Sequence, residues 1–188
     1  MKVAAIQMAS GPQVAANLSE AARHIGKAAV AGARLVVLPE NFAIMAQQDA
    51  DRLAAAERDG QGPIQEFLAA QARTHGVWLV GGTIPIKAND PKRVRAACLL
   101  FNDRGERVAR YDKIHLFDVR LDNGEVYNES ASIEPGDTPV VVDTPFGKLG
   151  LAVCYDLRFP ELFRQLLDQG AELLVVPSAC TLRTGRAH

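Results

Sequence analysis

The sequence predicts an α/β fold with mixed sheets, and three observations carry this prediction. Short apolar runs rich in β-branched residues, such as 34–39 and 172–177, indicate buried strands. Alanine-rich or amphipathic stretches such as 13–31 alternate with them, as in sheets covered by helices. Turn signals at 102–105 and 144–147 join neighbouring strands as hairpins, and hairpins add antiparallel pairs to an otherwise parallel arrangement.

The first elements are read from apolar periodicity. Residues 2–9 alternate well enough for a strand, and residues 13–31 form a helix that Gly32 can end. The run 34–39 is then a buried parallel strand. We expect the segment after it to be a polar loop, because it contains Gln47, Gln48, Asp49 and Asp51.

The middle of the chain contains a helix, a strand and a hairpin. Pro63 opens a helix that closes near Gly76, and 77–84 is the next strand. Residues 95–102 and 107–111 flank the first turn and form a hairpin.

The segment 112–138 has no sustained periodicity and is longer than ordinary connections, which marks it as functional or mobile. Residues 140–143 and 148–153 form a second hairpin. Pro160 starts a helix that runs to Gln169, and 172–177 is the last strand. Because no repeat, low-complexity tract or linker divides the chain, we expect one domain over residues 1–188.

Composition excludes several classes of function. The 188 residues have a formal net charge of −1, so nothing favours nucleic acid or an anionic membrane as a partner. No apolar run approaches the about 18 to 20 residues that a membrane span needs, and the opening apolar stretch is too short for a signal peptide. Three cysteines, an odd number without framework spacing, indicate thiols in a reducing compartment, so we expect a cytoplasmic protein. Neither a Cys-x-x-Cys pair nor clustered histidines suggest a metal, and we expect no cofactor.

Cys154 stands where a buried strand stops and a helix follows at once. The partial positive charge of a helix N-terminus favours thiolate over thiol. We therefore expect Cys154 to be a nucleophile with a lowered pKa.

Two further reactive side chains share this position after a predicted strand. They are Glu40 after 34–39 and Lys113 after 107–111. Because ligands collect outside the carboxyl ends of strands in open α/β sheets, the three groups together predict a site.

The chain resembles the nitrilase superfamily of carbon–nitrogen hydrolases. Several motifs in the family's order carry the resemblance: Leu38-Pro-Glu-Asn41, Tyr111-Asp-Lys-Ile-His-Leu116, Tyr127-Asn-Glu-Ser130 followed by Pro135-Gly-Asp137, Gly150-Leu-Ala-Val-Cys-Tyr-Asp-Leu-Arg-Phe-Pro-Glu-Leu162, Pro177-Ser-Ala179 and Thr184-Gly-Arg-Ala-His188. Their form is most similar to the amidases of deaminated glutathione and to the omega-amidases.

The resemblance implies a Glu-Lys-Cys triad of Glu40, Lys113 and Cys154, with Glu129 as a second glutamate that orients Lys113 or the substrate. Cys154 would attack the amide carbonyl, and Glu40 would act as general base and acid. Lys113 and the backbone N–H of Tyr155 would face the oxyanion.

The implied function is hydrolysis of a small linear carboxamide, first of all deaminated glutathione, to a carboxylate and ammonia. An omega-amidase acting on α-ketoglutaramate, or a nitrilase, would use the same triad. The resemblance also implies a homodimer and a four-layer α-β-β-α sandwich. Family members continue beyond the Gly-x-Ala-His element, so the sandwich would lack its C-terminal part here. A second hypothesis is therefore an inactive fragment that acts only as an assembly or binding module.

Other polar residues near the motifs have simpler interpretations. We expect Cys98 and Cys180 to be inert buried thiols, with contact between Cys180 and the substrate as the alternative. Asp156 and Arg158 are expected to form a structural ion pair, and His115 to pack or hydrogen-bond.

Overall fold

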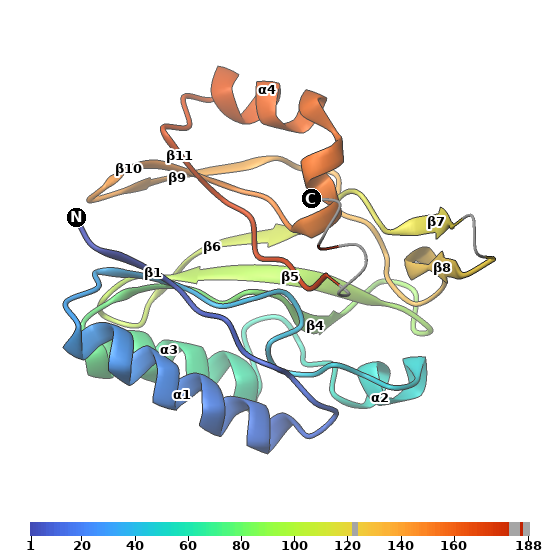
Figure 1. The fold of residues 1–188 in the computed structure, drawn as a ribbon, viewed down its shortest axis with the longest axis horizontal. Coiled ribbons are helices and arrows are strands. Elements are labelled where there is room, and N and C mark those ends of the chain that lie inside the picture. The colour runs from blue at the N-terminus through green and yellow to red at the C-terminus, as the bar shows by residue number, and fades with distance from the viewer. Residues whose placement is uncertain (122–123, 181–184, 186–188) are drawn as a thin grey trace.

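The computed structural model describes residues 1–121, 124–180 and 185 as four stacked layers (Figure 1). Helices α1 (Val14–Val30) and α3 (Pro63–His75) cover one face of a large sheet. A smaller sheet lies against its other face, and α4 (Pro160–Asp168) covers the outer side of that second sheet. This arrangement confirms the predicted α-β-β-α sandwich.

The large sheet has six strands in the order β1-β2-β3-β5-β4, with β6 also paired to β5. Strands β1, β2 and β3 run parallel, whereas β5 is antiparallel to β3, β4 and β6, so the sheet is mixed as expected. The strands are β1 (Val3–Ala5), β2 (Leu35–Val37), β3 (Trp78–Val80), β4 (Ile84–Lys87), β5 (Val94–Phe101) and β6 (Arg107–Asp112).

The second sheet has the order β11-β10-β9 and is also mixed, because β10 pairs parallel with β11 and antiparallel with β9. A separate hairpin pairs β7 with β8. These strands are β7 (Asp118–Arg120), β8 (Val126–Asn128), β9 (Val140–Thr144), β10 (Gly147–Leu151) and β11 (Leu173–Val175).

Alternation of side chains along the strands explains the layering. Val36 and Leu79 pack with the helix residue Ile25, whereas Leu35 and Val80 belong to the core between the sheets. Successive side chains of a strand point to opposite faces, so a strand that is apolar at every position must be covered on both sides. The continuous apolar run of β2 therefore forces the large sheet into the middle of the molecule.

Two local predictions were wrong. The expected polar loop after β2 contains a short helix, α2 (Asp49–Ala54), in which the Asp51 carboxylate accepts a hydrogen bond from the Gln48 N–H at 3.2 Å. The predicted strand 77–84 is two strands, because the chain leaves the ladder at Gly81 and Gly82 and resumes as β4. Capping by an aspartate and a break at paired glycines depend on local geometry that apolar periodicity does not report.

The segment 112–138 is more ordered than its lack of periodicity indicated. It contains the β7–β8 hairpin and a 3₁₀ turn over Glu129–Ala131, and it leaves β6 through Lys113. This segment was expected to be functional or mobile. Its position supports a functional segment, because the hairpin lies beside the cavity described below.

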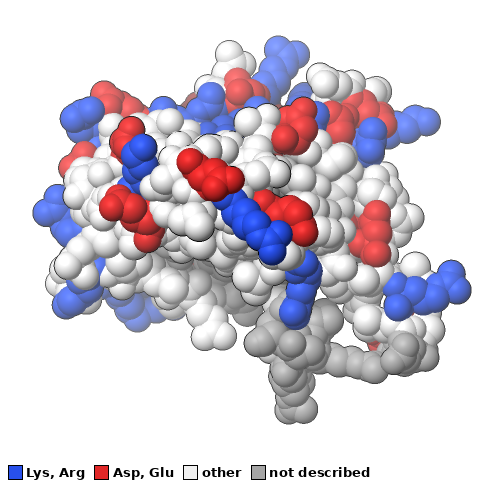
Figure 2. All heavy atoms as spheres, turned by 90° about the horizontal axis from the view of Figure 1, so that it is seen from above, with Lys and Arg blue, Asp and Glu red and all other residues white. Residues whose placement is uncertain are grey.

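Two further features of the fold are the distribution of surface charge and the length of the helices. On the face that carries α4, acidic and basic side chains are interspersed (Figure 2), as the net charge of −1 allows. Among the described residues, no helix is long and apolar enough to cross a bilayer.

Candidate active site

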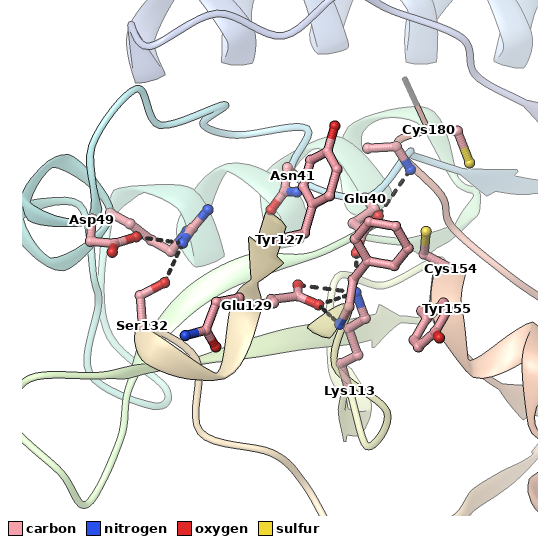
Figure 3. Close-up of a pocket in the computed structure, with 14 residues that line it drawn as sticks. Glu40, Asn41, Asp49, Lys113, Tyr127, Glu129, Ser132, Cys154, Tyr155 and Cys180 are labelled. Carbon is pink, nitrogen blue, oxygen red and sulfur yellow. Dashed lines mark hydrogen bonds and ion pairs between the residues drawn. The ribbon is translucent and has the colours of Figure 1, made fainter. Parts of the chain in front are cut away.

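A cavity of about 300 Å³ opens where the two sheets meet the β7–β8 hairpin (Figure 3). All five residues expected at the site line it: Glu40, Lys113, Glu129, Cys154 and Tyr155. The other lining residues are Asn41, Asp49, Arg52, Phe117, Tyr127, Asn128, Ser132, Ala179 and Cys180.

Glu40 lies on a tight turn beyond the end of β2. The next residue, Asn41, has a left-handed backbone with φ of 54°, and its N–H donates to Thr83 Oγ1 at 2.8 Å. Gly82 packs against this turn so closely that a Cβ there would lie 1.9 Å from the Pro39 carbonyl oxygen. The glycine that interrupts the predicted strand therefore makes room for the turn that presents Glu40.

Lys113 follows β6 directly and is almost completely buried. Its backbone N–H donates to the Ala96 carbonyl at 3.0 Å, which holds the strand end in the sheet. Its ammonium Nζ lies 2.8 Å from Glu40 Oε1 and 2.9 and 3.0 Å from the two oxygens of Glu129. The carboxylates are themselves held, since Glu40 Oε2 accepts the Ala179 N–H at 2.9 Å and Glu129 Oε2 accepts the Phe117 N–H at 2.6 Å.

The charge of Lys113 follows from these neighbours. Burial alone would lower the pKa of the ammonium, but the negative charges of Glu40 and Glu129 outweigh it and raise the pKa above its ordinary value. Lys113 therefore remains an ammonium at physiological pH.

Cys154 begins a 3₁₀ turn (Cys154–Arg158) just after β10, and Pro160 then opens α4. Its backbone is left-handed, with φ of 46°, and its N–H donates to the Pro177 carbonyl at 2.9 Å. Within the described part of the chain, Cys154 and Asn41 are the two non-glycine residues with positive φ. Such strain concentrates at functional sites and persists only where the surroundings enforce it.

The expectation of a lowered pKa for Cys154 was wrong. Burial raises the pKa of this thiol, and the charge of Glu40 together with its hydrogen bond raises it further. The ammonium of Lys113 and the N–H of Ala179 act in the opposite direction without reversing the shift. The helix-end argument failed because it omitted the burial of the thiol and a carboxylate that comes from a different strand. Cys154 is therefore a thiol at rest, with a proton acceptor beside it.

We predict that the alkylation rate of Cys154 by iodoacetamide keeps rising with pH into the alkaline range, because the raised pKa delays formation of the thiolate. Glu40→Gln removes the negative charge and should move the midpoint to lower pH. Mass spectrometry of the Cys154 peptide across a pH series measures both curves, with the same series on Cys180 as reference. A rate that already levels off at neutral pH would contradict the raised pKa.

Tyr155 follows Cys154, and its N–H is one of the first of the 3₁₀ turn, where no acceptor exists within the turn. Its ring makes edge contacts with Phe117 and Phe159, with centroids 5.0 and 5.5 Å apart. The residue whose backbone N–H is expected to face an oxyanion therefore packs its side chain against two aromatic rings.

Asp156 joins the segments that carry Lys113 and Cys154. The carboxylate is fully buried and accepts hydrogen bonds from Tyr111 Oη at 2.7 Å and from the Val153 N–H at 2.8 Å. It also contacts His115, through the backbone N–H at 3.0 Å and Nδ1 at 2.7 Å. Asp156 is thus structural, as expected, and His115 hydrogen-bonds, also as expected. The pairing of Asp156 with Arg158 stays a prediction.

The other two cysteines differ from each other. Cys98 is fully buried in the core between the sheets, and burial raises its pKa to about 12, so the inert interpretation is confirmed. Cys180 is exposed and lines the cavity, so the buried interpretation was wrong. Contact between Cys180 and a substrate stays a prediction.

Sequence reasoning missed most of the residues at the far side of the cavity, above all Asp49, Arg52 and Ser132. No recognisable sequence motif contains these three residues. They meet only because α2 packs beside the turn after β8. Asn41 and Ala179 could have been found, since both belong to the motifs that carry the family resemblance.

Within residues 1–121, 124–180 and 185, no three His, Cys, Asp or Glu side chains are grouped so that they could hold a metal ion.

Comparison with protein families decides the relationship that the motifs indicated. The family model described as carbon–nitrogen hydrolase matches residues 2–188. The chain belongs to the carbon–nitrogen hydrolase family. The chain is 44% identical over 188 residues to the deaminated glutathione amidase of Yersinia enterocolitica, covering 99% of this chain and 65% of that protein. It is 37% identical to the omega-amidase NIT3 of Saccharomyces cerevisiae, covering 100% of this chain and 66% of that protein.

Solved structures agree with the fold of this family member. The crystal structure of the Caenorhabditis elegans NitFhit protein matches 99% of this chain and 45% of its own, with 34% identity and a TM-score of 0.88. Nit3 of Saccharomyces cerevisiae, a member of branch 10 of the nitrilase superfamily, matches 95% of this chain and 64% of its own, with 32% identity and a TM-score of 0.82. The chain thus spans about two thirds of the length of its curated relatives.

Proposed function

We propose that this chain is a cysteine-dependent amidase that hydrolyses a small linear carboxamide through a thioester on Cys154. One observation carries the proposal. The thiol of Cys154 shares a cavity with the Glu40 carboxylate, which can take its proton, and with the Lys113 ammonium, which lies 2.8 Å from Glu40.

The first half of the reaction forms the thioester. Because the thiol is protonated at rest, Glu40 removes its proton as the sulfur attacks the carbonyl carbon. A C–S bond forms, and the π electrons of the carbonyl move to the oxygen, which the Lys113 ammonium and the Tyr155 N–H stabilise. When the tetrahedral adduct collapses, the C–N bond breaks and the nitrogen takes the proton from Glu40.

The second half hydrolyses the thioester. Glu40, again a carboxylate, takes a proton from water as the water oxygen attacks the thioester carbon. The C–S bond breaks and the sulfur recovers the proton. Glu129 acts as a positioning residue, since both of its oxygens lie within 3.0 Å of Lys113 Nζ and hold the ammonium in place.

Deaminated glutathione is the first substrate to test, because relatives with 44% and 40% identity are named deaminated glutathione amidases. Its amide nitrogen bears the rest of the peptide, so cleavage there would release an amine and not the ammonia stated in the sequence-based expectation. An unsubstituted amide such as α-ketoglutaramate would release ammonia, and relatives named omega-amidases keep this alternative open.

We further propose a homodimer in the cytoplasm. Three free thiols support a reducing compartment, and the dimer follows from the family resemblance. Size-exclusion chromatography with light scattering tests the assembly directly.

The test is to incubate the purified chain separately with deaminated glutathione and with α-ketoglutaramate. Chromatography quantifies the released amine and carboxylate, and a coupled assay quantifies ammonia. We expect turnover of at least one substrate, and Glu40→Gln should reduce it by about 10²- to 10⁴-fold because the general base is lost. Equal background with the wild-type chain and the variant, on folded protein, would contradict the amidase and leave an assembly or binding module as the function.

A further inference from the structure

Cys180 presents a second thiol to the cavity, and the proposed reaction does not use it. Of the three cysteines, Cys98 is buried, Cys154 is half-buried and Cys180 is exposed. Cys154 and Cys180 line the same cavity, and Figure 3 shows both sulfur atoms at one end of it, away from Asp49 and Ser132. The proposed nucleophile therefore shares its cavity with a solvent-accessible thiol.

Backbone contacts show that the two cysteines lie near each other. The ladder between β10 and β11 continues beyond both strands, because the Cys154 N–H donates to the Pro177 carbonyl at 2.9 Å. Two residues later, the Ala179 N–H faces the Cys154 thiol and also donates to Glu40 Oε2 at 2.9 Å. Cys180 directly follows this residue, and the Cα atoms of consecutive residues are about 3.8 Å apart. A disulfide joins Cα atoms about 4 to 7 Å apart, so the exposed Cys180 is the residue that would move to close the bond.

Exposure and charge decide which thiol an oxidant meets first. Peroxide oxidises cysteines that are accessible to solvent and able to ionise. Cys180 is exposed, whereas burial and the charge of Glu40 raise the pKa of the Cys154 thiol and keep it protonated at rest. Cys98 is excluded on both counts, because it is fully buried and its pKa is raised to about 12. We therefore expect peroxide to oxidise Cys180 first.

We propose that Cys180 is a redox modification site, whose oxidation by hydrogen peroxide leads to a disulfide with Cys154. In the first step the Cys180 sulfur attacks a peroxide oxygen, the O–O bond breaks, and the departing hydroxide takes the thiol proton and leaves as water. Cys180 is then a sulfenic acid. In the second step Cys154 attacks this sulfur while Glu40 takes the Cys154 proton and passes it to the departing hydroxide. The S–S bond forms, the S–O bond breaks, and a second water is released.

The balance is one peroxide reduced to two waters and two thiols oxidised to one disulfide. A thiol reductant reverses the modification, and disulfides in a reducing compartment are mostly of this transient, redox-sensing kind. The effect on turnover rests on the proposed function, because a disulfide at Cys154 stops hydrolysis only if Cys154 is the nucleophile.

The experiment treats the purified, reduced chain with hydrogen peroxide, alkylates and digests it without reductant, and maps the peptides by mass spectrometry. We expect a peptide pair joined through Cys154 and Cys180, and an intact mass lower by two hydrogen atoms. The rate of amide hydrolysis should fall by at least about 10-fold and recover with dithiothreitol. Separate sulfinic acids on the two cysteines, or a link to Cys98 or to a second copy of the chain, would overturn the proposal.

Cys180→Ser tests the exposed thiol by changing one atom of its side chain. It should give no cross-linked peptide, and peroxide should oxidise its Cys154 at least about 10-fold more slowly than in the wild-type chain. Oxidation of Cys154 at an unchanged rate would contradict the proposed order of steps. Cys98→Ala is the matched control, because it removes the thiol in the core and should leave the disulfide unchanged.

Cys154→Ala supplies a readout that does not depend on turnover. Without Cys154 to attack it, the sulfenic acid on Cys180 should accumulate, and dimedone should trap it as an adduct on the Cys180 peptide. Absence of this adduct on folded protein, checked by circular dichroism, would overturn the proposal. If the wild-type chain hydrolyses no amide, the proposed function fails, while the peptide map and the dimedone trap still decide whether the disulfide forms.

Discussion

Cys154→Ala is expected to reduce amide hydrolysis by about 10⁵- to 10⁶-fold, to the level of background, because it removes the thiol proposed to form the acyl intermediate. Removing a nucleophile eliminates the covalent route, so the loss should exceed that from any other single substitution in the site. Initial rates with a substrate that the wild-type chain turns over measure this loss. Intact-mass spectrometry of rapidly quenched reactions should detect an acyl adduct on the wild-type chain and none on Cys154→Ala.

Cys180→Ala is the matched control for this prediction. Cys180 also presents a thiol to the cavity but is exposed and begins no strained turn. Its replacement should change the rate by less than about 10-fold and leave the acyl adduct in place, since binding contacts of this size are worth about 1 to 3 kcal/mol. If Cys180→Ala loses the acyl adduct while Cys154→Ala keeps it, Cys180 is the nucleophile and the assignment of Cys154 is wrong.

Lys113→Met should damage both activity and stability. We expect a fall in kcat of at least about 10²- to 10³-fold, because an electrostatic stabiliser of the oxyanion is removed. We also expect the free energy of unfolding to fall by about 3 to 5 kcal/mol, because the buried carboxylate of Glu40 and the partly buried carboxylate of Glu129 would lose their cation. Urea denaturation followed by circular dichroism measures the stability, and steady-state kinetics measures the rate.

Two further variants separate these effects. Adding Glu129→Gln to Lys113→Met removes one of the uncompensated charges, so stability should partly return while activity stays lost. Lys87→Met replaces an exposed lysine at the end of β4 and should change neither quantity appreciably. If Lys113→Met unfolds with the same free energy as Lys87→Met, the buried ion-pair network does not stabilise the fold in the way described.

Much of the fold could be predicted from local sequence signals. Apolar runs located β2, β10 and β11, prolines located the starts of α3 and α4, and the turn at 102–105 located the hairpin of β5 and β6. These signals are reliable because a strand buried on both faces must be apolar throughout, and because proline is tolerated in the first turn of a helix. The hairpin of β7 and β8 carried no such signal, since its short strands are mostly exposed.

The sequence by itself determined the layered α/β fold, the family and the position of Cys154, Glu40 and Lys113 after strands, because those properties follow from local periodicity and from motifs contiguous in the chain. Only the tertiary structure decided what these residues do to one another. Glu40 and Lys113 come from one sheet and Cys154 from the other, so the carboxylate that raises the thiol pKa is remote in sequence. Electrostatic interactions depend on distance in space and not on separation along the chain. Helix α2 likewise brings Arg52 to the same cavity, although no sequence motif predicts this position.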